Sequence, residues 1–185
     1  MPASSRSSSE LVAAPTPPDS SAGTNLYLTF VLDGEAYATG ILSIKEIIEY
    51  GGVTAVPLMP PTVRGVINLR GAVVPVLDLS LRFGRTATSI GRRSCVVIIE
   101  TGPLDARIVI GVIVDAVMAV QEIAPEDIGP TPSFGMKIAT QFIRGIGKAG
   151  GRFVILLDME QVLSIDELAA LGAAQVASAP LETQR

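Results

Sequence analysis

RGVINLRGAVVPVLDL, residues 64–79, recurs 80 positions later as RGIGKAGGRFVILLDM, residues 144–159. Each copy holds an Arg-Gly pair, two strand-like runs joined by a glycine-containing turn, and an aspartate 14 positions after the arginine. A weaker correspondence, at an offset of 71, relates the segments that begin at Gly40 and Gly111. Repetition at a fixed spacing is typical of duplicated structural units. The sequence therefore predicts two similar β subdomains, each about half of the ordered region.

Short strands are predicted along most of the chain. Residues 26–32 alternate in the way a half-buried strand does, and the Asp33-Gly34 pair that follows is typical of a two-residue hairpin turn. Further apolar or alternating runs, separated by Gly, Pro and Asn, lie at 64–69, 72–77, 94–100, 107–114, 117–121, 142–146 and 152–157. An odd number of strands in each half, closed on itself, predicts a mostly β fold of two small barrels.

Short helices are predicted at four places. Ser43 and Glu46 have the spacing of a capping box, which predicts a helix with the isoleucines at 44, 47 and 48 on one side. Ser164–Glu167 has the same spacing and predicts a second helix, over 164–171, that Gly172 can end. The aspartates Asp78 and Asp158 each leave a strand and are expected to cap short helices over 79–83 and 159–163.

Composition limits the function classes. The chain has 185 residues, 48% of them apolar and 17% charged, which is enough for one globular domain over 25–172. Residues 1–24 and 173–185 lack apolar content and are expected to be disordered tails. The net charge of −4 and the scarcity of aromatic residues argue against nucleic-acid binding. A protein or a small molecule is the expected partner.

The residue types that support catalysis and export are scarce. Histidine is absent, and the one cysteine, Cys95, lies in an apolar run, so no metal or cofactor site is expected and a reducing cytosol is the expected compartment. The apolar stretch 108–120 is interrupted by Asp115 and is shorter than the ~20 residues of a membrane-spanning helix. We therefore expect a protein that is neither exported nor inserted in a membrane.

Asp78 and Asp158 permit two interpretations. One aspartate from each half of a duplicated β protein could form a paired carboxylate centre, as in an aspartyl hydrolase. However, the Asp-Thr-Gly or Asp-Ser-Gly turn of those enzymes is missing, because Leu79-Ser80 and Met159-Glu160 follow instead. Helix capping is the favoured role.

Arg70 is the clearest candidate for recognition of a partner. It lies in Asn68–Gly71, a tight turn between two apolar strands, from which its side chain is expected to project. A planar cation on a rigid turn suits the carboxylates or carbonyls of another protein. A solvated arginine without a partner is the alternative.

The chain resembles the CheW family of bacterial chemotaxis adaptors. The resemblance is carried by residues 64–79, by Tyr27–Phe30 and by Ile110–Asp115, and it extends to the predicted helix at 164–171. It implies two intertwined five-stranded SH3-like barrels. It also implies a non-catalytic cytoplasmic adaptor that couples the tips of methyl-accepting chemoreceptors to the histidine kinase CheA, and that is recruited to membrane-bound receptor arrays without entering the membrane.

The resemblance also implies site residues. Receptor binding in the groove between the barrels is expected at Ile44, Glu46, Ile47, Asn68, Leu69, Arg70, Val96, Val117 and Val120. Contact with the kinase's regulatory domain, on the barrel edges, is expected near Gly65 and Gly145. The alternatives that stay open are a scaffold for a chemosensory-type kinase pathway with another output and, in a different class, the hydrolase that would use Asp78 and Asp158.

Overall fold

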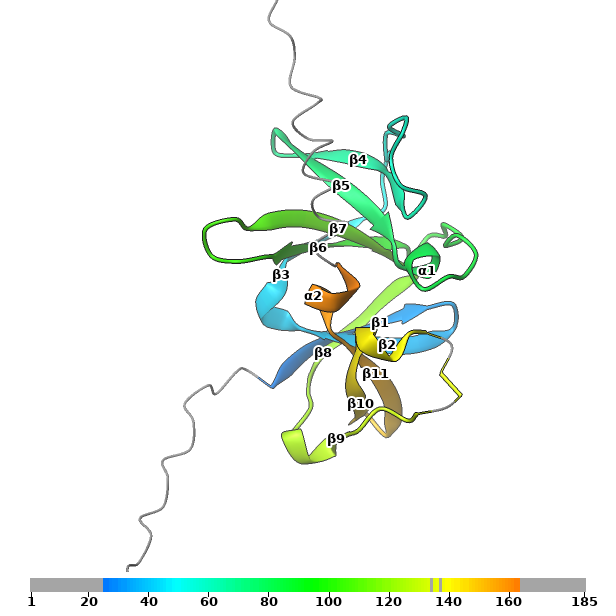
Figure 1. Cartoon of the computed structure of the whole chain (residues 1–185), viewed down its shortest axis with the longest axis vertical. Coiled ribbons are helices and arrows are strands. Elements are labelled where there is room, and N and C mark those ends of the chain that lie inside the picture. Colours follow the sequence, from blue (N-terminus) through cyan, green and yellow to red (C-terminus); the bar gives the residue numbers. More distant parts are fainter. Residues whose placement is uncertain (1–24, 134, 137, 164–185) are drawn as a thin grey trace, which may run out of the picture.

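The computed structural model describes residues 25–133, 135, 136 and 138–163, which form two β-sheets with a few short helices (Figure 1). The strands are β1 (Leu26–Leu32), β2 (Glu35–Gly40), β3 (Ile44–Glu49), β4 (Val63–Leu69), β5 (Ala72–Asp78), β6 (Cys95–Thr101), β7 (Ile108–Val114), β8 (Ala116–Glu122), β9 (Ile128–Gly129), β10 (Ile143–Ala149) and β11 (Arg152–Leu157). The helices are α1 (Leu79–Arg82) and α2 (Met159–Val162), with single 3-10 turns η1 (Ile41–Ser43), η2 (Pro125–Asp127) and η3 (Thr140–Phe142). The predicted mostly β fold is confirmed.

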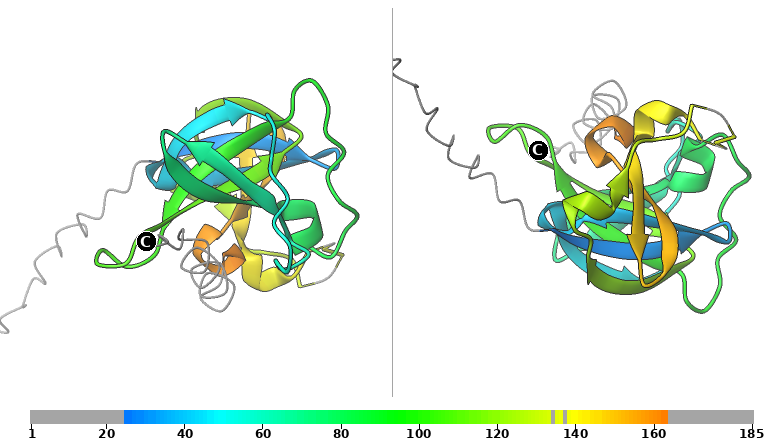
Figure 2. Two further views of the ribbon diagram at one scale, coloured as in Figure 1. Left: turned by 90° about the horizontal axis from the view of Figure 1, so that it is seen from above. Right: turned by 90° about the horizontal axis from the view of Figure 1, so that it is seen from below.

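The two sheets are intertwined along the chain. Sheet A has the order β8-β1-β2-β11-β10-β9, and sheet B has the order β3-β6-β7-β5-β4. The chain therefore begins in sheet A, builds all of sheet B and returns to sheet A at Asp115, between β7 and β8. Figure 2 shows sheet B nearest the viewer in its left panel and sheet A in its right panel.

The sequence repeat corresponds to equivalent places in the two sheets. In sheet B, β5 runs parallel to β7 with Val76 opposite Gly111, and in sheet A, β11 runs parallel to β2 with Leu156 opposite Ala38. Val76 and Leu156 occupy the same position of the repeat, 80 residues apart. Each copy also has a register shift at its Arg-Gly pair, between Val63 and Gly65 and between residues 143 and 145. The two copies of the repeat therefore occupy equivalent positions, one in each sheet.

The glycine of each Arg-Gly pair lets a second segment of chain cross close to it. After β3 the backbone crosses to the opposite edge of sheet B and pairs with β4 through two hydrogen bonds between Thr54 and Val66, each 2.9 Å. A Cβ on Gly65 would lie 2.1 Å from the Thr54 carbonyl oxygen, and its φ of +147° also favours glycine. In sheet A, β9 pairs with β10, and a Cβ on Gly145 would lie 2.9 Å from the Gly129 carbonyl oxygen. These crossings link the two edges of each curved sheet.

Both faces of the central strands are buried, which explains their continuous apolar sequences. In β6, Val97 and Ile99 face a cluster between the sheets, while Val96 and Ile98 face a second cluster inside sheet B. A third cluster, inside sheet A, includes Leu156. The protein thus has one core between the sheets and a smaller core within each.

Two local predictions can be compared directly with the structure. The Asp33-Gly34 turn has positive φ at both residues, 50° and 75°, as the predicted hairpin requires. The helix predicted from the Ser43–Glu46 capping box is wrong. Only η1 is helical, and residues 44–49 form β3, an edge strand paired with β6. The Ser43 hydroxyl donates to the Gly40 carbonyl, 3.1 Å away, instead of capping a helix. The helix predicted at 164–171 lies outside the described residues.

Candidate partner-binding face

Arg70 projects from the turn between β4 and β5 and pairs with Glu46 on β3. The two guanidinium nitrogens lie 3.0 and 2.9 Å from the two carboxylate oxygens, a bidentate geometry, and 79% of the Arg70 side chain is exposed. The φ of Arg70 is +52° and that of Gly71 is +88°, so the turn has the geometry in which Asn or Gly is usually the first residue. The turn is stabilised by Asn68, whose side-chain oxygen accepts from the Gly71 N–H at 2.8 Å.

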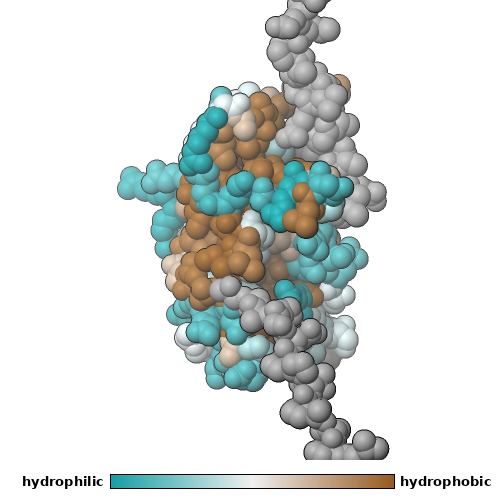
Figure 3. Space-filling model, turned by 90° about the vertical axis from the view of Figure 1, so that its left-hand side faces the viewer, coloured by the Kyte–Doolittle hydropathy of each residue, from teal (hydrophilic) through white to brown (hydrophobic). Residues whose placement is uncertain are grey.

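Apolar residues of β3 and β8 lie near the junction of the two sheets. Ile44 of β3 and Val117 of β8 are half-buried and both pack against the central cluster. Farther along the same strands, Ile47 is 40% exposed and Val120 is 48% exposed. Figure 3 shows a hydrophobic surface on the side of the molecule where Figure 1 places β3. Leu69, at the end of β4, is half-buried against the core of sheet B.

Three of the residues inferred from the resemblance are not available at the surface. Val96 is 0% exposed because its side chain points into sheet B, so it cannot contact a receptor in this conformation. Gly65 and Gly145 are also buried, under the segments that close each sheet, so neither glycine can touch the kinase itself. These three assignments are corrected to packing roles.

Met118 of β8 is an exposed residue that the sequence analysis did not identify, and its side chain lies beside Ala36 and Val154 of sheet A rather than beside Ile44. The β1–β8 register passes from Thr29 opposite Ala119 to Phe30 opposite Val117, which leaves Met118 as the extra residue of a bulge. Its side chain is 49% exposed. The bulge explains why Met118, Ala119 and Val120 are exposed in succession, which strand alternation does not predict.

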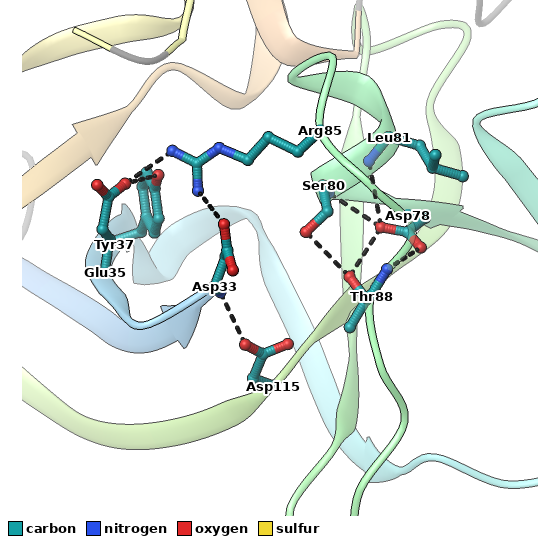
Figure 4. Close-up of polar contacts among 9 residues, drawn as sticks. All are labelled: Asp33, Glu35, Tyr37, Asp78, Ser80, Leu81, Arg85, Thr88 and Asp115. Carbon is teal, nitrogen blue, oxygen red and sulfur yellow. Dashed lines mark hydrogen bonds and ion pairs between the residues drawn. The ribbon is translucent and has the colours of Figure 1, made fainter.

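Asp78 and Asp158 both cap helices, as predicted. Asp78 accepts from the N–H groups of Ser80 and Leu81 at 2.9 and 3.3 Å, and Asp158 accepts from those of residues 160 and 161 at 3.1 and 3.2 Å. Asp78 is completely buried and also accepts from the N–H and the hydroxyl of Thr88, both at 2.8 Å (Figure 4). It accepts from Arg64 as well, at 3.1 Å. The two aspartates lie at the ends of strands in different sheets, and neither has the surroundings of a paired catalytic carboxylate.

A cavity of about 640 Å³, lined by both polar and apolar residues, lies between the end of β2, the β6–β7 hairpin and the start of α2. Its charged lining includes Glu100, Arg107, Arg144 and Asp158. Hydrogen bonds from Lys45 and Arg107 lower the pKa of Glu100. Both N–H groups that Asp158 caps donate to the same carboxylate oxygen, Oδ1.

Within the described part of the chain, no helix is long and apolar enough to cross a membrane.

Comparisons with known proteins agree with this fold. A family model described as CheW-like domain matches residues 26–167. The chain is 36% identical over 143 residues to the chemotaxis protein CheW of Klebsiella aerogenes, which covers 77% of this chain and 84% of the relative. It is 30% identical over 139 residues to that of Thermotoga maritima, covering 74% and 85%. The crystal structure of the scaffolding protein TtCheW from Thermoanaerobacter tengcongensis superposes with a TM-score of 0.67 at 31% identity, covering 77% of this chain and 89% of that one.

Proposed function

The chain belongs to the CheW family, non-catalytic adaptors of chemotaxis signalling, and on that premise we propose that it couples methyl-accepting chemoreceptors to the histidine kinase CheA. The observation that carries the proposal is the arrangement of β3, β8 and the β4–β5 turn. Apolar side chains of two strands, one from each sheet, border the central cluster, and Arg70 of the β4–β5 turn pairs with Glu46 of β3. A protein that couples two partners without catalysis needs an exposed apolar surface of this kind, to which a partner can bind.

The chemoreceptor tip binds this face as a helix. An amphipathic helix places its apolar side in a groove through anchors spaced three and four residues apart. Ile44 and Val117 provide the floor because they are anchored in the core between the sheets, and Ile47 and Val120 provide exposed apolar area. Arg70 lies at the rim, where its exposed pair with Glu46 is weak enough to be exchanged for a carboxylate of the receptor.

The kinase binds the edges of the two sheets, away from the receptor groove. Gly65 and Gly145 contribute indirectly, since each allows a closing segment to lie close against its sheet. Those segments lie beside β4 and β10: the segment at Thr54 pairs with β4, and β9 pairs with β10. The resemblance implies that the regulatory domain of CheA has a CheW-like fold of its own. Two domains of similar fold can pack edge to edge, which fits this contact.

The protein acts in the cytoplasm and reaches the membrane only through the receptors it binds. The same surfaces would serve a chemosensory-type kinase pathway whose output is not motility. The two pathways differ in the effector downstream of the kinase and share the coupling step.

Co-recruitment tests the coupling directly. Receptor-tip fragments are attached to vesicles, and sedimentation of the CheA regulatory domain is measured with and without the chain. We expect the kinase domain to sediment only when both the receptor fragment and the chain are present. Sedimentation that is independent of the chain, or a chain that binds one partner and excludes the other, would contradict the proposed function.

A further inference from the structure

The last residue of α1 and the residues just after it belong to the sheet-B half of the fold and contact the other half through three side chains. The Arg82 guanidinium lies 4.6 Å from the centre of the Phe142 ring, and its Nε donates to the Val162 carbonyl at 2.8 Å. Phe83 is part of a row of four aromatic rings, with Phe30, Tyr37 and Phe142, whose neighbouring centroids are 5.9 to 6.0 Å apart. The third side chain is that of Arg85.

Arg85 binds the β1–β2 turn of sheet A (Figure 4). Its Nη2 lies 2.7 Å from Glu35 Oε2 and its Nη1 lies 3.4 Å from Asp33 Oδ2. Only 11% of the Arg85 side chain is exposed, unlike the surface arginines at 70 and 107. The buried Tyr37 hydroxyl donates to the same Glu35 oxygen at 2.8 Å. Burial, and then this hydrogen bond, raise the pKa of Tyr37 above its usual range, so the phenol stays protonated as a donor.

The partners of Arg85 are held in place independently of it. The Asp33 N–H donates to Asp115 Oδ2 at 2.7 Å, and the Asp115 N–H donates to the Val31 carbonyl at 3.0 Å. Asp115 is the residue at which the chain passes from sheet B back to sheet A. The β1–β2 turn is therefore attached on one side to the crossover and on the other side to Arg85.

The base of Arg85 is fixed to sheet B. The backbone N–H of Arg85 donates to the Ser80 carbonyl at 2.9 Å. Three residues later, the backbone N–H and the hydroxyl of Thr88 both donate to the buried Asp78 carboxylate. A side chain with a rigid base and a planar fork loses little further freedom when it binds two carboxylates. Arg85 thus joins two preformed parts, one in each half of the protein, and its ion pairs depend on how the sheets are oriented.

We propose that Arg85 is a positioning residue whose ion pairs with Asp33 and Glu35 set the orientation of sheet A relative to sheet B, and thereby the affinity for the receptor. The second half of this inference rests on the proposed function. The receptor face takes Ile44 from sheet B and Val117 from sheet A, so its shape changes when the sheets rotate relative to each other. Each kinase edge lies within one sheet, so the shape of the edge itself does not change with that rotation.

The orientation can be measured without any partner. Spin labels at Val73 of β5 and Lys148 of β10, both exposed, report the distance between the sheets once Cys95 is replaced by serine. We expect Arg85→Gln to broaden the distance distribution. Arg107→Gln is the matched control, because Arg107 pairs with Glu100 within one sheet, and it should leave the distribution unchanged. An unchanged distribution in Arg85→Gln would overturn the proposal.

Titrations with a receptor-tip fragment and with the kinase regulatory domain then test the consequence. Arg85→Gln should weaken receptor binding by about threefold to tenfold while kinase binding stays within about twofold. Arg85→Lys, which keeps the charge and loses the fork, should recover part of the affinity. Glu35→Gln removes the negative charge from the Arg85–Glu35 ion pair. Because Arg85→Gln already breaks this pair, the double variant should lose little more receptor affinity than Arg85→Gln alone. Intact receptor binding in a broadened variant would overturn the link between orientation and affinity. A wild-type chain that fails to bind the receptor would contradict the proposed function, and the distance measurement would still decide the role of Arg85.

Discussion

Replacing Asp78 and Asp158 by alanine compares two equivalent helix caps in different surroundings. Both substitutions remove a side chain that accepts two N–H bonds at the start of a four-residue helix, which costs ~1 kcal/mol. For the half-buried Asp158 no further loss is expected. For the fully buried Asp78, the Thr88 N–H also loses its acceptor, and a buried donor without a partner costs ~1–3 kcal/mol.

The expected losses are therefore ~1 kcal/mol for Asp158→Ala and ~2–4 kcal/mol for Asp78→Ala. The Thr88 hydroxyl keeps a partner in Ser80 Oγ at 3.1 Å, and Arg64 is partly exposed, so neither adds much to the second value. Urea unfolding followed by circular dichroism measures both free energies under one condition. Equal losses would refute the reasoning, because they would mean that the Thr88 contacts contribute nothing beyond the cap.

Three further predictions use the same unfolding assay. Gly65→Ala should cost ~2–4 kcal/mol because its Cβ would overlap the Thr54 carbonyl, whereas Gly71→Ala, with positive φ but open space around it, should cost only ~1 kcal/mol; similar losses would contradict the close crossing. Removal of residues 1–22 should leave the urea midpoint of unfolding unchanged, because their composition offers little to bury, and a midpoint at clearly lower urea would contradict this. The pKa of Glu100 is lowered below its ordinary 4.5, so its stabilisation is full above that pH and is lost as the pH falls through the folded value. The destabilisation caused by Glu100→Gln should therefore be largest at neutral pH and should shrink as the pH falls below 4.5, and a loss that does not change with pH would contradict the assignment.

The repeat made most of the fold predictable. Two copies of one pattern define equivalent strand pairs, and alternation locates the strands that bury one or both faces. The error at residues 43–48 has a physical cause. Ser43 and Glu46 have helix-capping spacing, but the β-branched residues between and after them gain more by pairing with β6. Local capping preference was overridden by tertiary contacts.

The candidate site was less predictable, because it depends on burial and on contacts between distant residues. Inference from the family located β3, β8 and the turn at Arg70, but it could not show that Val96 points into sheet B. The bulge that exposes Met118 depends on pairing with β1. The contacts of Arg85 join residues about fifty positions apart, and no pattern along the chain marks them.

Titration of wild type and Arg70→Ala against a receptor-tip fragment and against the CheA regulatory domain tests the receptor-binding face most directly. Arg107→Ala serves as the control, since it removes an exposed arginine from a hairpin outside the proposed groove. If Arg70 is an anchor of the face, its loss should weaken receptor binding by ~2 kcal/mol, about thirtyfold, and leave kinase binding and the unfolding midpoint nearly unchanged. Receptor binding that is unaffected by Arg70→Ala, or that weakens equally toward both partners, would contradict the account.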